Sequence, residues 1–163
     1  MATEKKLEDL FHHTLQDIYY AEKQILKAIP KMAAGAKSPE LKKAFEHHKD
    51  QTEVHVERLE DVFKMIGQPA KGVKCDAIEG ILKEGEGALE DFGKSISGDA
   101  AIIAAAQAVE HYEITRYGTL RRWAKVLGMN DAQVLLEMTL KEEAATDEGL
   151  TSLADSYANK QAA

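Results

Sequence analysis

The sequence is poor in residues that stop helices or cross-link a fold. Its 163 residues include three prolines and one cysteine. That single cysteine, Cys75, cannot form an internal disulfide, which suits a reducing compartment. Runs of β-branched residues are scarce, whereas Ala, Glu, Lys and Leu are abundant. This composition predicts an all-α protein.

The chain also lacks a basic patch and a long apolar run. Its formal net charge is −7, and the Lys and Arg residues are scattered among acids, so we expect no binding to nucleic acid. No apolar run approaches the roughly 20 residues that span a bilayer. The charged segment Met1–Asp9 lacks the apolar core of a signal peptide. We therefore expect a cytoplasmic protein with no membrane contact, folded as a single domain over residues 1–163.

Four stretches of the chain carry apolar residues spaced alternately four and three apart, which marks the inward face of a helix in a bundle. They run from Phe11 to Met32, Leu41 to Ile66, Ala106 to Leu127 and Leu136 to Tyr157. Near its middle, each apolar face is interrupted by residues that ionise or bind metal. These residues are Glu22 in the first stretch, His48 and His55 in the second, Glu110 and Glu113 in the third, and Glu143 and Asp147 in the fourth.

Helix boundaries follow from caps and breakers. We expect helices over residues 4–34, with Pro30 bending or ending the first, and 39–66, with Ser38 as N-cap. A third long helix begins near Ser97 or Asp99 and ends at Gly128. A fourth begins at Asn130, which forms a capping box with Gln133, and its tail from Tyr157 is expected to fray.

Residues 67–98 link the two tight hairpins and contain a weaker amphipathic piece. We interpret this link as a long crossover that carries a short extra helix. The resulting architecture is a four-helix bundle with one crossover, which is the ferritin-like connectivity. The apolar crossover residues Ile78, Ile81, Leu82 and Phe92 need a cover, and we expect a homodimer to provide it.

The polar residues lie near the midpoints of their helices, so side-by-side packing would bring them to one level. An ionised carboxylate removed from water costs several kcal/mol. Five together would repel one another unless they took up protons or shared cations. No Lys or Arg occupies the four apolar faces. A divalent or trivalent metal is therefore the expected partner.

Particular segments resemble a known family. The segment Val109–Ile114, VEHYEI, followed by YGTL at 117–120, resembles a metal motif of rubrerythrin relatives. With AEKQ at 21–24 and Glu142-Glu143 near Asp147, the chain is similar to the YciF/YciE branch of ferritin-like stress proteins. The resemblance implies a homodimer and a dinuclear iron-type site, with manganese as an alternative metal. It also implies that Glu22, Glu110, Glu113 and Glu143 are ligand carboxylates.

The sequence departs from the usual di-iron pattern, in which Glu-x-x-His occurs on two helices. Here the second helix has His48-x-x-Gln51, in reversed order, and the fourth has Glu143-x-x-Thr146. We predict that Asp147 replaces the missing ligand, and Gln51 and His55 are further candidate ligands. The predicted metal ligands are Glu22, His48, Glu110, Glu113, Glu143 and Asp147.

Other residues near this set have plainer interpretations. His111 points about 100° away from Glu110 around the helix, so it is expected beside the site or at the surface. Tyr19 and Tyr117 lie one turn from the acids, and we favour core packing over a bond to a ligand.

Three functions remain compatible with the sequence. The first is a ferritin-like metalloprotein that oxidises Fe(II) or consumes peroxide. The second is a stress-associated homodimeric scaffold with a vestigial site, and the third is a metal buffer without turnover. A single cysteine cannot hold an Fe–S centre, so any reductant would come from a partner.

Overall fold

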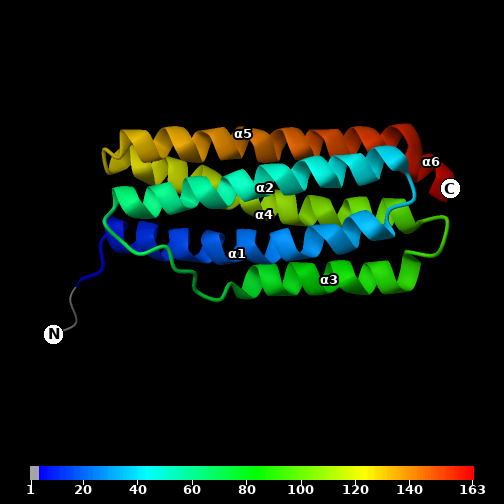
Figure 1. Ribbon diagram of the computed structural model, residues 1–163, viewed down its shortest axis with the longest axis horizontal. Helices are drawn as coiled ribbons and strands as arrows, with labels where there is room; N and C mark the ends of the chain where they lie inside the picture. Colours follow the sequence, from blue (N-terminus) through cyan, green and yellow to red (C-terminus); the bar gives the residue numbers. More distant parts are fainter. Residues whose placement is uncertain (1–3) are drawn as a thin grey trace.

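Four long helices lie side by side with alternating directions (Figure 1). They are α1 (Leu7–Gly35), α2 (Pro39–Met65), α4 (Gly98–Val126) and α5 (Asn130–Leu153). The structure is a computed structural model, and it describes residues 4–163. Helices α1 and α5 each contact both α2 and α4, so the four surround one core. No strand occurs within residues 4–163. The predicted all-α fold, a four-helix bundle with one crossover, is confirmed.

The crossover carries helix α3 (Asp76–Phe92), which packs against α1 and α4 (Figure 1). Cys75 caps this helix by accepting the backbone N–H of Ile78 at 3.4 Å. Ile78 is fully buried, and Ile81 and Leu82 pack against the core. The chain itself therefore covers Ile78 fully and Ile81 and Leu82 in part. Only Phe92 is left half exposed.

Local signals explain most helix ends. Ser38 accepts the N–H of Leu41, and Pro39 opens α2, as predicted. Pro30 lies inside α1, which continues to Gly35. Gly128, with φ of 71°, makes the left-handed turn between α4 and α5. The predicted capping box is wrong, because Asn130 is already helical and Met129, without a side-chain cap, precedes it.

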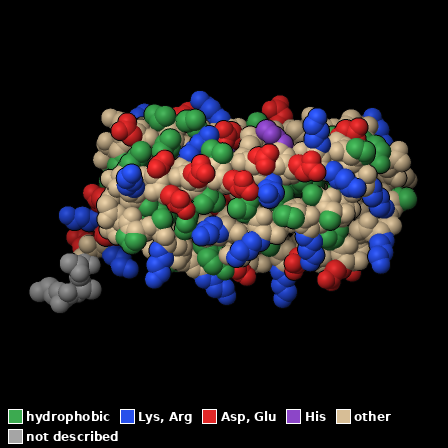
Figure 2. All heavy atoms as spheres, viewed as in Figure 1, with side chains coloured by type: hydrophobic (Ala, Val, Ile, Leu, Met, Phe, Trp, Pro, Cys, Tyr) green, Lys and Arg blue, Asp and Glu red, His purple; other side chains and the backbone are tan. Residues whose placement is uncertain are grey.

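The carboxyl-terminal residues are helical rather than frayed. A π-helical turn spans Ala154–Ala158, and α6 spans Asn159–Ala162. Ala158 is buried against the bundle, so the expectation of a frayed tail is wrong. None of the helices within residues 4–163 is long and apolar enough to cross a membrane. Side chains of both charges are interspersed over the face shown in Figure 2.

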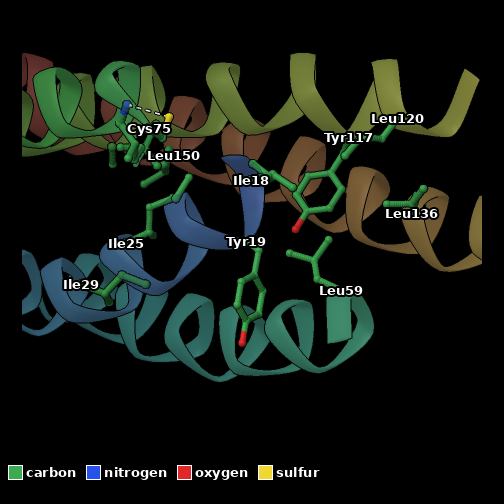
Figure 3. Close-up of a cluster of buried hydrophobic side chains, with 14 of the residues drawn as sticks. Ile18, Tyr19, Ile25, Ile29, Leu59, Cys75, Tyr117, Leu120, Leu136 and Leu150 are labelled. Carbon is green, nitrogen blue, oxygen red and sulfur yellow. Dashed lines mark hydrogen bonds between the residues drawn. The ribbon is translucent and has the colours of Figure 1, made fainter. Parts of the chain in front are cut away.

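Apolar side chains from all four long helices fill the core on both sides of its middle (Figure 3). Towards the turn between α4 and α5, these include Leu59, Leu120 and Leu136. Towards the turn between α1 and α2, they include Ile29 and Leu150. These layers exclude water from whatever lies between them.

Asp99 on α4 supports the turn between α1 and α2. Its carboxylate accepts the backbone N–H groups of Lys37 at 2.7 Å and Ser38 at 2.9 Å, and it is 4% exposed. Replacing Asp99 with Ala would leave buried donors unsatisfied, so we expect a loss of about 1 to 3 kcal/mol in the free energy of unfolding. Urea denaturation measures this. The exposed Asp91→Ala control should change stability little, and equal losses would contradict the assigned role.

Candidate metal centre

Six ionisable side chains meet at the middle level of the bundle. Glu22 comes from α1, His48 and His55 from α2, Glu110 and Glu113 from α4, and Glu143 from α5. Each is at most 4% exposed. Residues that the four-and-three spacing places on the inward faces of four helices thus form one buried cluster, at the level expected from the helix midpoints.

The cluster contains two overlapping groups of possible metal ligands. His48, Glu110, Glu113 and Glu143 offer ligand atoms that all lie within 4.8 Å of one another. Glu22, His55 and Glu143 form a second group under the same limit. Because Glu143 belongs to both groups, the arrangement suits two neighbouring ions that share a carboxylate.

Most of these polar atoms have no hydrogen-bond partner. The unpartnered atoms are Glu22 Oε2, both ring nitrogens of His48, His55 Nδ1, Glu110 Oε2 and both carboxylate oxygens of Glu113 and Glu143. Buried polar atoms are rarely left unpaired in a folded protein. His48 Nε2 lies 3.0 Å from Glu110 Oε1 without forming an aligned hydrogen bond. Two ligand atoms at right angles about one ion, each roughly 2.1 Å from it, are separated by about this distance.

Burial and mutual repulsion shift the ionisation of these acids. Burial, then the charges of Glu143 and Glu22, raise the pKa of Glu113 well above its ordinary value. Burial is also the main cause that raises the pKa of Glu110 to about 7. Burial likewise raises the pKa of Glu143 well above its ordinary value. Without a cation, these carboxyl groups hold protons at a pH where a carboxylate is normally ionised.

The two imidazoles differ in their surroundings. Burial lowers the pKa of His48, which keeps its ring neutral. Burial also disfavours protonated His55, but the adjacent carboxylates of Glu143 and Glu22 outweigh it and raise its pKa to about 11. His55 Nδ1 lies 2.8 Å from Glu143 and 3.4 Å from Glu22. A bound cation would replace the ring proton at Nδ1.

A carboxylate and an arginine orient His55 from outside the cluster. His55 Nε2 lies 2.8 Å from Glu142, which accepts two hydrogen bonds from the guanidinium of Arg58 at 2.7 and 3.0 Å. Such a carboxylate fixes the tautomer and leaves Nδ1 to face the site. We did not predict roles for Glu142 and Arg58 from sequence.

Tyr117 has a polar role that the sequence interpretation did not favour. Its buried hydroxyl donates a hydrogen bond to Glu22 Oε1, so it does more than pack. Burial would raise the pKa of Glu22, but the adjacent His55, together with this bond, outweighs it and lowers that pKa. Tyr19 is directed elsewhere and donates to Glu60 at 2.9 Å.

The structure places Asp147 and Gln51 outside the two groups. Asp147 lies 3.1 Å from His111 Nε2 and accepts a hydrogen bond from Gln107 at 3.1 Å. Gln51 lies at the edge of the site, where Thr146 donates to it at 3.5 Å. His55 instead supplies the second imidazole. The donor set is thus four carboxylates and two imidazoles, the same composition as in ferritin-like di-iron proteins, although both imidazoles come from α2.

Comparison with known proteins assigns the family. Residues 6–163 match the model of a family described as a domain of unknown function, DUF892. The chain belongs to the DUF892 family. It is 44% identical to protein YciF of Escherichia coli K12 over 159 residues, covering 97% of this chain and 96% of YciF.

Solved structures agree with the fold. The crystal structure of the E. coli stress protein YciF matches with a TM-score of 0.91 and 44% identity, over 96% of this chain and 99% of YciF. YcfI of Rhodopseudomonas palustris, described as a candidate structural protein, matches with a TM-score of 0.89 and 45% identity, over 93% and 97% of the two chains. A Xanthomonas campestris protein at 20% identity and a TM-score of 0.74 shares the fold.

The raised pKa values predict how stability depends on pH. In the metal-free protein, Glu110 binds a proton up to about pH 7, whereas in the unfolded chain it releases that proton near 4.5. The folded state therefore holds more protons in this window, and the free energy of unfolding should fall as pH rises from 4.5 to 7. His55 contributes in the same direction above pH 6.5. Urea denaturation of chelator-treated protein at several pH values measures this trend. Added metal should remove or reverse it, and identical curves would contradict a metal centre.

Replacing Glu110 with Gln removes one charge at nearly constant shape. We expect weaker metal binding, together with a metal-free protein of equal or greater stability, by up to about 3 kcal/mol at pH 8. Metal titration and urea denaturation measure the two effects. A less stable metal-free variant with unchanged metal affinity would make Glu110 a structural hydrogen-bond partner instead.

Proposed function

We propose that this protein binds two metal ions, iron or manganese, in the buried cluster and uses them in redox chemistry on ferrous iron or peroxide. The observation that carries the proposal is the set of unpartnered carboxylate and imidazole atoms between the four helices. Within the cluster, protonated His55 supplies one positive charge for four carboxyl groups. Divalent metal accounts for all its members together.

Each residue of the cluster has a distinct part in holding the ions. His48, Glu110 and Glu113 would hold one ion, and Glu22 and His55 the other, with Glu143 between them. Tyr117 fixes the carboxylate of Glu22, and Glu142 fixes the ring of His55. The ligands are therefore oriented before metal arrives, which favours binding.

Iron, when bound, supplies one-electron chemistry between its ferrous and ferric states. The chain supplies the surroundings: apolar layers exclude bulk water, and Glu113 can hold a proton within the site. Consumption of one peroxide takes two electrons and two protons and yields two waters. With one cysteine in the chain, an external partner would return the electrons.

A second candidate function is a homodimeric scaffold associated with stress, in which metal binding is weak or absent. The described roles of two relatives favour it, since YciF is called a stress protein and YcfI a candidate structural protein. The motif His48-x-x-Gln51 favours it as well, because it departs from the Glu-x-x-His order of di-iron sites. A metal buffer without turnover is the third candidate. For all three we propose a cytoplasmic homodimer.

Element analysis of protein from iron-supplemented cells tests the proposal. We expect about two iron or manganese ions per chain, fewer in Glu143→Gln, and unchanged content in the exposed Glu148→Gln control on the same helix. Each ferrous-loaded sample is then given hydrogen peroxide, and peroxide loss is followed against metal-free protein.

The two readouts separate the candidates. Metal that is retained and turns over supports the proposal, whereas metal without turnover supports the buffer. If neither metal nor turnover is found, the scaffold is favoured and the proposal is wrong. Equal metal loss in Glu143→Gln and Glu148→Gln would also count against the assigned ligands.

A further inference from the structure

A largely apolar cavity of about 230 Å³ reaches into the bundle beside the candidate metal centre. It occupies the half of the core nearer the turn between α1 and α2. Its buried walls include Ile25, Phe45, Ala106 and Leu150, which come from all four long helices. A well-packed interior contains few voids larger than one water molecule, and this hollow, which is open to solvent at one end, extends inward as far as His48 and Glu110. Metal binding by the six side chains of the candidate metal centre does not require this cavity.

The inner end of the cavity is polar. His48 and Glu110 line it, and both side chains are at least nine-tenths buried. Neither ring nitrogen of His48 has a hydrogen-bond partner; Nε2 lies 3.0 Å from Glu110, which leaves Nδ1 free for another ligand. This contrasts with His55, whose outer nitrogen is paired with Glu142. A ligand with an oxygen at its inner end would satisfy His48 Nδ1.

The outer end of the cavity opens between α2 and α5. Its exposed lining residues are His47 on α2 and Ala145 and Gly149 on α5. Ala145 and Gly149 lie one turn apart, so the α5 rim carries almost no side chain. A Cβ atom built on Gly149 meets nothing within 4 Å, so helix packing does not require this glycine. Glycine inside a helix costs up to about 1 kcal/mol relative to alanine, and at this position it keeps the rim open.

The volume of the cavity and the charges of its lining residues limit which molecules it can bind. An apolar cavity of 150 Å³ holds benzene, which has six heavy atoms, so one of 230 Å³ holds about nine in proportion. Nine heavy atoms correspond to an eight-carbon chain with one oxygen. Among the lining residues none is Lys or Arg, whereas Glu110 and Glu142 are both present. An anionic head group would be buried there without a cationic partner, so a neutral one is favoured.

We propose that this cavity binds a neutral aliphatic molecule of about eight carbons, such as an alcohol, aldehyde or hydroperoxide, with its oxygen at His48 and its chain along the apolar walls. The alkyl chain replaces water on apolar surface, and the oxygen pairs with the free ring nitrogen. The site adds a binding function for an organic molecule to a centre otherwise suited to inorganic ions.

Calorimetric titration with 1-octanol and with octanoate tests the proposal. Full-length protein is first dialysed against a chelator, because bound ions would themselves attract a carboxylate. We expect saturable binding of one 1-octanol per chain, and binding of octanoate weaker by a factor of about ten or more, because the cavity offers no Lys or Arg to pair with a carboxylate. Absence of saturable octanol binding, or equal affinity for octanoate, would overturn the proposal.

Matched variants locate the binding. Ala145→Leu and Gly149→Leu extend a side chain into the mouth, and each should weaken octanol binding by a factor of about ten or more. Ala144→Leu is the control, since Ala144 is exposed on the same helix but does not line the cavity. Circular dichroism confirms that each variant is folded, and two rim positions guard against failure of one. Unchanged binding in both rim variants, or equal loss in Ala144→Leu, would place the octanol elsewhere.

Discussion

The burial of four carboxylates at one level of an apolar bundle is the constraint on which the structure depends. Glu22, Glu110, Glu113 and Glu143 are at most 1% exposed, and burial raises the pKa of the last three. Transfer of even one ionised carboxylate out of water costs several kcal/mol, comparable with the stability of a whole domain. The carboxylates at this level therefore need protons, cations or both. The surrounding apolar layers increase the free-energy cost of any carboxylate that stays ionised and unpaired.

The helical repeat explains which site residues the sequence could predict. Seven residues complete nearly two turns, so His55 stays within about 20° of His48 and faces the same cluster. Four residues overshoot one turn by about 40°, which moves Asp147 towards His111 and Gln107 on α4. The bundle, its crossover and the convergence of the acids followed from spacing and breakers. Whether His55 or Asp147 enters the cluster depended on a rotation of about 20° to 40° around the helix axis.

Contacts between helices could not be predicted in this way. Glu142 and Arg58 lie off the apolar faces, and only packing of α2 on α5 brings them to His55. The hydroxyl of Tyr117 finds Glu22 across the core, a pairing that no single-helix pattern contains. The predicted cap of α5 was wrong for a local reason. The helix follows directly on the turn at Gly128, so Asn130 is its first residue rather than its cap. Periodicity thus determines which residues face inward, whereas packing between helices determines which residues hydrogen-bond to them.

The central claim is that metal ions, rather than protons alone, hold the buried carboxylates. Anomalous diffraction from crystals of iron-loaded protein, recorded on both sides of the iron absorption edge, tests it most directly. The account predicts two edge-dependent peaks inside the bundle, one beside His48 and one beside His55, with Glu143 between them. Peaks confined to surface carboxylates, or no peak with the six side chains paired to one another, would contradict it.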